Sequence, residues 1–312
     1  MKIILFGLRR SGTTLAFQIF RTCKTLRCFY EPLHPGLVFP EKSSCLNNDK
    51  KNVYSEYRLL GKELFSRHEG LGAPLHDVVD ELAPNALTKR HLDYLDFLFE
   101  SAPDVLIQPV RLTYQLQQLR TRYPDARFVW VVRQPEGFIR SVLTYRPDWL
   151  TYRDAGLASN RSIKAQKKNI LLRALKGWNA FDNPWSQIAA ANAIVQREPV
   201  FKDLTNAPSW IKLMALWYDH YRVVTEFAKD NASNFHMLNY EKACRSDAYV
   251  KELFASLQLD CSMVNLAGLI DAKVVGRQQV VTLDVSDGEE MIQRKYEMMG
   301  APLDLSYRRL MG

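Results

Sequence analysis

The residue types best suited to chemistry lie near the start of the chain, in a loop bounded by Gly7 and Gly12. Residues 3–6 before it are apolar, and the stretch 11–14 that closes it reads Ser-Gly-Thr-Thr. A strand that turns through such a loop into a helix aims several backbone N–H groups at one anion, and the helix dipole adds about half a positive charge there. The pattern predicts an anion-binding loop over residues 7–14, which we call the 7–14 loop.

This loop differs from the Gly-x-x-x-x-Gly-Lys-Ser/Thr pattern of triphosphate-binding loops, because Thr13 stands where that pattern has its lysine. The cation is displaced to Arg10, inside the loop. In triphosphate-binding enzymes the lysine contacts the β- and γ-phosphates, and the hydroxyl holds Mg²⁺. A loop without that lysine is poorly suited to ATP and favours a shorter anionic group.

A second motif with phosphate-binding chemistry lies at residues 124–143. Residues 128–132 form a continuous apolar run, which is typical of a buried parallel strand, and Arg133 follows at its end. Pro135 marks the turn, and Ser141 lies on the next predicted helix. A guanidinium can bind two phosphate oxygens at once, and a nearby hydroxyl adds a donor. The alternative is a structural arginine that pairs with a carboxylate, with Ser141 facing solvent.

The two motifs together resemble sulfotransferases that use 3′-phosphoadenosine 5′-phosphosulfate, and their style is closest to carbohydrate and bacterial members. The run from Arg10 to Leu15 resembles the 5′-phosphosulfate loop of that family, and residues 124–143 resemble its 3′-phosphate site. The resemblance implies this donor and a reaction that needs no metal. It also implies the donor-binding residues, which are Arg9, Arg10, Ser11, Gly12, Thr13 and Thr14 at the 5′ end and Arg133 and Ser141 at the 3′-phosphate.

Sulfuryl transfer needs charge stabilisation on the leaving oxygen and a base for the attacking hydroxyl. We expect Arg10 to supply the charge, because an arginine does not readily give up its proton. Glu31 opens a Glu-Pro-Leu segment that resembles a short motif of carbohydrate sulfotransferases, and we predict that it is the base. The alternatives are a structural Glu31 paired with an arginine, and His34 or His91 as the base.

Two features of the resembling family are not recognisable here. Soluble members of that family have a histidine just before the 3′-site strand, and the comparable position in this sequence lies near Arg111. We expect Arg111 to bind sulfate or acceptor together with Glu31 and His34. The C-terminal Lys-Gly segment that grips the 3′-phosphate is also missing, and Arg277 is the candidate substitute.

The order of apolar runs predicts strands that alternate with helices, which is the pattern of a parallel sheet with crossover helices. The expected strands are at residues 3–6, 26–30, 105–110, 128–132 and 235–240, and the expected helices are at 15–23, 88–100, 113–122, 214–228 and 248–257. With the resemblance, the fold class is α/β, a three-layer P-loop NTPase-like fold with a central parallel sheet flanked by helices. We expect a single domain over 1–312 with a variable, tryptophan-rich acceptor-side insert at about 145–210.

Composition limits the classes of partner and site. The formal net charge is +8, so the surface attracts anionic ligands, but the cations are scattered and accompany no nucleic-acid-binding motif. Five cysteines without a Cys-x-x-Cys pair and six histidines without ligand spacing favour a reducing compartment and predict no metal site. No run approaches the roughly 20 apolar residues of a membrane-spanning helix. We expect a cytoplasmic protein if Met1 is the native start.

The sequence leaves the acceptor open, because glycans, tyrosine peptides, lipids and small phenols all present a hydroxyl. A glycan is one candidate, and the oligomeric state is not indicated. Two other functions compete with sulfuryl transfer: a P-loop-type small-molecule kinase, and a nucleotide-binding protein without transfer activity.

Overall fold

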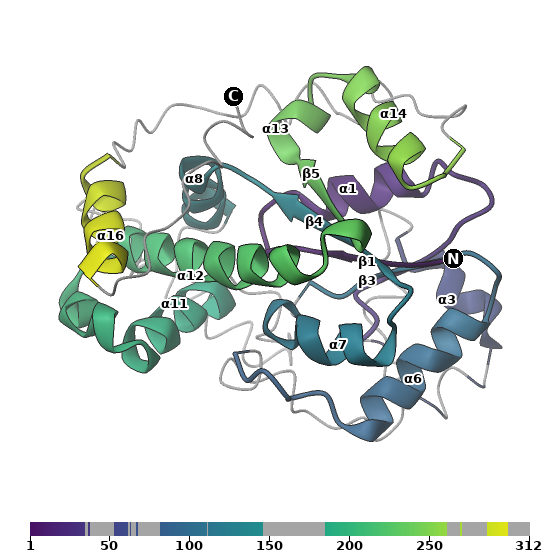
Figure 1. Ribbon diagram of the computed structural model, residues 1–312, viewed down its shortest axis with the longest axis horizontal. Helices are drawn as coiled ribbons and strands as arrows, with labels where there is room; N and C mark the ends of the chain where they lie inside the picture. The colour runs from purple at the N-terminus through teal and green to yellow at the C-terminus, as the bar shows by residue number, and fades with distance from the viewer. Residues whose placement is uncertain are drawn as a thin grey trace, which may run out of the picture. The chain divides into compact units, whose positions relative to one another are not determined.

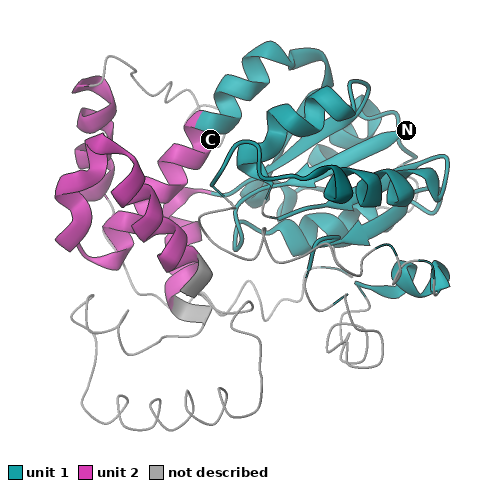
Figure 2. Ribbon diagram, turned by 90° about the horizontal axis from the view of Figure 1, so that it is seen from below, with its two compact units in different colours: residues 1–133, 223–280, 311 teal, residues 134–222, 281–310, 312 magenta. Residues whose placement is uncertain are grey.

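The structure is a computed structural model that describes residues 1–34, 37, 53–61, 63, 67, 82–110, 112–145, 185–260, 269 and 286–298. The chain divides into two compact units (Figure 2). The first unit comprises residues 1–133 and 223–280, and the second comprises residues 134–222 and 281–310. The expectation of a single domain over the whole chain stays a prediction.

A five-stranded sheet with the order β2-β3-β1-β4-β5 forms the centre of the first unit. All of its pairings are parallel, as the sequence predicted. The strands are β1 Lys2–Phe6, β2 Arg27–Tyr30, β3 Val105–Gln108, β4 Arg127–Val132 and β5 Phe235–Asn239. Where the strands end, Tyr30 pairs with Gln108 and Val132 pairs with Asn239. The carboxyl ends of neighbouring strands therefore lie side by side, and open α/β sheets bind ligands just beyond these strand ends.

Helices cover both faces of the sheet (Figure 1). On one face lie α1 (Thr13–Phe20), α13 (Tyr240–Ala243) and α14 (Asp247–Ser256), and on the other lie α6 (Lys89–Glu100), α7 (Leu116–Arg122) and the end of α12 (Ser209–Asp230). Phe20 of α1 meets Phe254 of α14 at 5.0 Å within one helical layer, and Phe128 of β4 meets Phe227 of α12 at 5.0 Å between the sheet and the other layer. The predicted α/β architecture, a central parallel sheet flanked by helices, is confirmed.

The central strands are buried on both faces, which explains their continuous apolar runs. In β1, residues 3–6 have no exposed surface, and β3 is buried throughout. At the edge of the sheet, α3 (Ser55–Leu59) packs against β2 through Phe29 and Tyr57, whose rings lie 5.1 Å apart. The predicted helix over 113–122 is divided into a 3₁₀ turn, η3 (Thr113–Gln115), and α7.

The second unit is helical where it is described. It contains α8 (Pro135–Tyr145), α11 (Trp185–Arg197), η5 (Pro199–Asn206), the start of α12 and α16 (Ser286–Met298). Asp219, which is fully buried, joins α11 to α12 because it accepts hydrogen bonds from Arg197 at 3.0 Å and from Arg222 at 2.7 Å. The predicted insert lies outside the described residues from 146 to 184, and from 185 to 206 it is helical.

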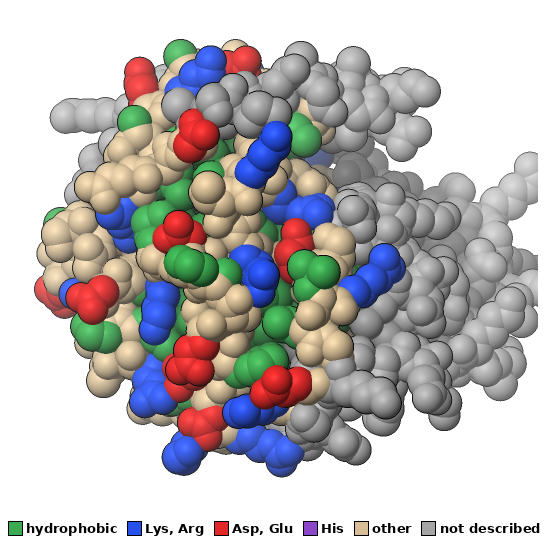
Figure 3. Space-filling view, turned by 90° about the vertical axis from the view of Figure 1, so that its right-hand side faces the viewer, with side chains coloured by type: hydrophobic (Ala, Val, Ile, Leu, Met, Phe, Trp, Pro, Cys, Tyr) green, Lys and Arg blue, Asp and Glu red, His purple; other side chains and the backbone are tan. Residues whose placement is uncertain are grey.

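The surface carries charges of both signs. On the face shown in Figure 3, Lys and Arg side chains alternate with Asp and Glu and with apolar side chains. Within the described part of the chain, no helix has the length and apolar character needed to cross a membrane.

Candidate functional site

The 7–14 loop connects the end of β1 to α1, as the sequence predicted, and it folds around a single carbonyl group. The backbone N–H of Ser11 donates to the Leu8 oxygen at 3.0 Å, and the Ser11 hydroxyl donates to the same oxygen at 2.6 Å. Only 3% of Ser11 is exposed. Ser11 therefore fixes the shape of the loop through its side chain. Helix α1 begins two residues later, at Thr13.

Two residues of this loop have an unusual backbone conformation. Arg10 has a φ angle of 74° and Gly12 has a φ angle of 94°, both in the left-handed region. Gly12 is the N-cap of α1, and no side chain of the described residues caps this helix. Alternation of left-handed and right-handed residues before a helix creates a concave group of N–H donors that binds anions. The geometry suits one phosphate or sulfate group at the start of α1.

Gly12 also lies directly against the turn that follows β5. A Cβ atom added to Gly12 would overlap ring carbons of Tyr240, the first residue of α13. At Gly7, an added Cβ would lie 2.5 Å from the carbonyl oxygen of Val131. Both glycines of the motif are therefore required by close packing, and Gly12 is required by its backbone conformation as well.

We predict that Gly12→Ala destabilises the chain by about 1–3 kcal/mol beyond the cost of its left-handed backbone, because the Tyr240 ring has to move. Thermal unfolding measures this loss. Gly61→Ala is the matched control, since Gly61 also has a positive φ, of 59°, but nothing lies within 4 Å of an added Cβ. Equal losses in melting temperature for the two variants would show that the ring moves aside without cost.

Arg133 connects the second motif to the 7–14 loop. From the end of β4, its Nη1 donates to the Arg10 carbonyl oxygen at 3.1 Å. Its guanidinium lies over the Tyr240 ring, 4.5 Å from the centroid, and its Nε is 3.9 Å from Oε1 of Glu241. The structure thus brings Arg133 to the loop, and it also shows the pairing with a carboxylate that the structural alternative expects.

Tyr240, which lies beside both Gly12 and Arg133, has a shifted pKa. Burial raises the pKa of Tyr240, the neighbouring Cys244 raises it further, and the Arg133 guanidinium lowers it. Tyr240 is therefore neutral at physiological pH. Its ring packs against Gly12 and supports the guanidinium through a cation–π contact.

The end of β2 also contacts α1, although β3 separates β2 from β1 in the sheet. Thr14 Oγ1 and the Tyr30 hydroxyl lie 2.8 Å apart in a hydrogen bond. Burial raises the pKa of Tyr30, and the negative charge of Glu31 raises it further. Tyr30 is therefore a neutral phenol that ties the start of α1 to the strand that presents Glu31.

Glu31 leaves β2 with a strained backbone. Its φ angle is 44°, and its N–H still donates to the Gln108 carbonyl oxygen at 3.1 Å. Three non-glycine residues of the described chain have positive φ: Arg10, Glu31 and Gln258. Gln258 directly follows Leu257, the C-cap of α14, and is the left-handed residue that commonly ends a helix. Arg10 and Glu31 have no such explanation, and strained residues of this kind concentrate at functional sites.

His34 accompanies Glu31 in a tight turn. Its N–H donates to the Glu31 carbonyl oxygen at 2.9 Å, and its Nε2 lies 3.8 Å from Glu31 Oε2. The two side chains are 10% and 18% exposed, respectively. The carboxylate and the imidazole therefore form a partly buried pair at the end of β2, as expected if they share a site.

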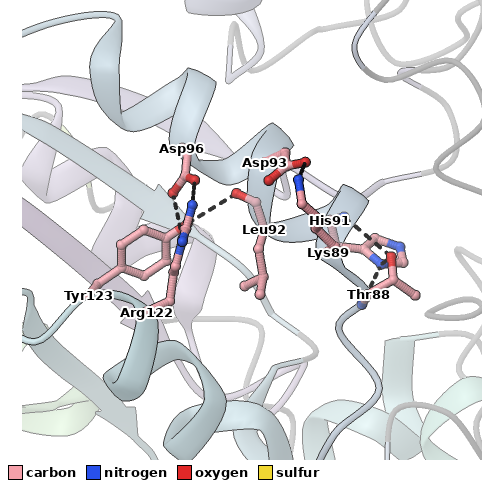
Figure 4. A network of polar contacts seen from close by, with 8 residues as sticks. All are labelled: Thr88, Lys89, His91, Leu92, Asp93, Asp96, Arg122 and Tyr123. Carbon is pink, nitrogen blue, oxygen red and sulfur yellow. Dashed lines mark hydrogen bonds and ion pairs between the residues drawn. The ribbon is translucent and has the colours of Figure 1, made fainter.

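His91, the other histidine considered as the base, caps the start of α6 (Figure 4). Its Nδ1 accepts a hydrogen bond from the Thr88 N–H at 3.1 Å, and its own N–H donates to the Thr88 hydroxyl at 3.4 Å. This reciprocal pair is a capping box at the start of α6. His91 is 2% exposed, and burial together with Arg90 lowers its pKa. The imidazole is thus committed to the end of the helix.

Gln108 is a polar residue of this region that sequence reasoning missed. It ends β3, has no exposed surface, and neither atom of its side-chain amide has a hydrogen-bond partner among the described residues. A buried unsatisfied polar group costs about 1–3 kcal/mol. The available signal was a single amide at the end of the otherwise apolar run Val-Leu-Ile-Gln.

The described structure does not test three of the predicted site residues. Arg111 and Arg277 lie outside the described residues. Ser141 is a half-buried residue of α8 and belongs to the second unit, so its contact with the same ligand as Arg133 stays a prediction. Within the described ranges, no three His, Cys, Asp or Glu side chains are grouped so as to hold a metal ion.

Comparison with known proteins identifies the family. The profile described as "Sulfotransferase family" matches residues 2–195, which include the 7–14 loop, Glu31 and Arg133. This chain belongs to the sulfotransferase family. The matched region of this sulfotransferase-family chain ends within α11, before α12 and β5.

Two individual proteins resemble this sulfotransferase-family chain. An uncharacterised protein of Archaeoglobus fulgidus is 27% identical over 152 residues, which are 43% of this chain and 45% of that protein. The alignment thus spans less than half of the relative. The crystal structure of the sulfotransferase STF9 from Mycobacterium avium matches with a TM-score of 0.46 and 13% identity, over 96% of this chain and 75% of that one.

Proposed function

We propose that this chain transfers a sulfuryl group from 3′-phosphoadenosine 5′-phosphosulfate to an acceptor hydroxyl. The observation that carries the proposal is the contact between its two phosphate-type motifs. Arg133 Nη1 donates to the carbonyl oxygen of Arg10, a residue 123 positions away in the sequence, next to the N–H groups at the start of α1. One site with two separated anion-binding parts suits a nucleotide that carries phosphate at both its 3′ and 5′ positions.

The 5′ end of the donor binds at the 7–14 loop. Backbone N–H groups of residues 12–14 and the dipole of α1 hold the 5′-phosphate, Ser11 keeps the shape of the loop through its bonds to Leu8, and Arg9 adds positive charge nearby. Arg133 and Ser141 hold the 3′-phosphate, and Arg277 is the candidate third group there. Support for this division comes from the position of Arg133 beside the loop, because the guanidinium needs only to exchange its contacts with Arg10 and Glu241 for phosphate oxygens.

In the transfer step, the acceptor oxygen attacks sulfur on the side opposite the bridging oxygen. A new O–S bond forms, the S–O bond to the 5′-phosphate breaks, and its electron pair stays on the phosphate as 3′,5′-adenosine bisphosphate leaves. The Arg10 guanidinium stabilises the charge that grows on the bridging oxygen. The acceptor's proton passes to the Glu31 carboxylate. The step uses side chains and backbone N–H groups of this chain.

Glu31 is favoured over the two histidines as the base. Its strained backbone at the end of β2 supports a functional role, and Tyr30 links its strand to Thr14 at the start of α1. His91 is engaged in the capping box, so its imidazole has a structural task. His34 Nε2 is 3.8 Å from Glu31 Oε2, and we propose that His34 binds the acceptor together with Arg111, which lies outside the described residues.

The acceptor is a molecule that presents a hydroxyl, and a glycan is the candidate that the Glu31 segment favours. Nothing in the described residues favours the kinase alternative, because Thr13 replaces the lysine that a triphosphate requires. The proposal is tested by metal-free binding of 3′,5′-adenosine bisphosphate, followed by transfer of radiolabelled sulfate to a pool of sugars, phenols and tyrosine peptides.

A further inference from the structure

Gln108 lies at the end of β3, between the two halves of the proposed site. β3 lies between β1, which leads into the 7–14 loop, and β2, which leads to Glu31. The backbone of Gln108 already contacts the second of these, because its carbonyl oxygen accepts from the Glu31 N–H at 3.1 Å. Gln108 is therefore next to the residue proposed as the base.

The register of the strands places the Gln108 side chain on the face covered by α1. Residues that pair across a parallel ladder have side chains on the same face of the sheet. Gln108 pairs with Tyr30, and the Tyr30 hydroxyl bonds to Thr14 of α1 at 2.8 Å. The amide therefore lies on the same face of the sheet as the start of α1, where the anion site is proposed.

This amide is unusual among the buried amides of the described chain. Gln187 and Asn239 each have one side-chain atom without a hydrogen-bond partner among the described residues, whereas in Gln108 both Nε2 and Oε1 lack such a partner there. Its exposed fraction is 0%. Buried polar groups in native proteins are nearly always paired, so an amide with two unpaired atoms calls for partners that arrive from outside the chain.

We infer that Gln108 is a further catalytic residue, whose amide bridges the two reacting groups; the inference rests on the proposed sulfuryl transfer. A sulfuryl group presents only acceptor oxygens, so it takes a hydrogen bond from Nε2. An acceptor hydroxyl carries a proton, so it donates to Oε1 before that proton moves to Glu31. Neither reactant satisfies both atoms alone. The amide is fully paired only when donor and acceptor are bound together, in line for transfer.

Two matched substitutions test this inference in the full-length chain. Gln108→Met keeps the length of the side chain and removes both unpaired atoms, so the melting temperature of the free protein is expected to rise by about 2–4 °C. Gln115→Met is the control, because Gln115 is equally buried but donates from Nε2 to the Ala83 carbonyl oxygen at 2.5 Å. That variant loses a hydrogen bond, and its melting temperature is expected to fall.

The same two variants are then assayed with labelled 3′-phosphoadenosine 5′-phosphosulfate and the acceptor pool. Turnover by Gln108→Met is expected to fall about 10²-fold, as for the loss of a donor to developing charge. Its affinity for 3′,5′-adenosine bisphosphate, which lacks the sulfuryl group, stays unchanged. A lower melting temperature for Gln108→Met, or turnover equal to that of the parent chain, overturns the inference. A parent chain that transfers no sulfate overturns the proposed function instead, and with it the two partners assigned to the amide.

Discussion

Glu31→Gln is expected to lower turnover by about 10²–10⁴-fold, the range that general base catalysis contributes. Glutamine has nearly the same shape as glutamate but cannot take the acceptor's proton at neutral pH. Glu31 lies at the end of β2 with a φ angle of 44°, and its side chain is 18% exposed, so it is both held in place and accessible. Because donor binding uses other residues, affinity for 3′,5′-adenosine bisphosphate should not change.

Glu56→Gln is the matched control for this experiment. The Glu56 side chain is 17% exposed and accepts a hydrogen bond from Arg21 Nε at 3.2 Å, so it resembles Glu31 in burial but has a structural partner. Its replacement should affect stability and leave turnover unchanged. Full turnover by Glu31→Gln would show that Glu31 is not the base. A substitution of His34 would then be tested in the same assay.

Arg133→Ala is expected to weaken binding of 3′,5′-adenosine bisphosphate by about 10–10²-fold, which corresponds to charged hydrogen bonds worth about 1.5–3 kcal/mol. The guanidinium is 14% exposed and already lies beside Arg10 of the loop. Arg133→Lys keeps the charge but loses the planar pair of donors, so its affinity should be intermediate. Calorimetric titration of both variants measures the loss.

Arg127→Ala provides the comparison for Arg133, since Arg127 lies at the opposite end of the same strand. Its guanidinium bonds to the Leu257 carbonyl oxygen and, at 2.7 Å, to Gln258. Removal of this arginine should lower stability and keep the bisphosphate affinity. If both variants bind the bisphosphate as the parent chain does, Arg133 is a structural strand-end residue and the 3′-phosphate site lies elsewhere.

The fold was predictable because its strands are continuous apolar runs buried on both faces. Residues 3–6 and 128–132 follow this pattern, and the structure places them in adjacent parallel strands. The 7–14 loop was predictable because glycines and hydroxyls recur there at a spacing that only a few backbone geometries use. Helix ends were less accurate, since α1 begins at Thr13, two residues before the first apolar residue of its pattern.

Contacts between distant segments could not be read from the sequence. The packing of Tyr240 on Gly12 joins residues far apart in the chain, and no local pattern predicts it. The same is true of α16, where Gly288 lies so close to Trp210 that an added Cβ would overlap its ring. The positive φ angles of Arg10 and Glu31 are also invisible in sequence, because tertiary contacts impose them against local preference.

Sulfuryl transfer by this chain requires that it recognises a nucleotide with a 3′-phosphate and a single 5′-phosphate. The decisive measurement is a calorimetric titration of the purified protein with 3′,5′-adenosine bisphosphate in the presence of a metal chelator, alongside ATP with Mg²⁺. We predict that the bisphosphate binds without metal and at least about tenfold more tightly than ATP, a difference of about 1.4 kcal/mol. Tighter binding of ATP with Mg²⁺ would contradict sulfuryl transfer and favour a kinase.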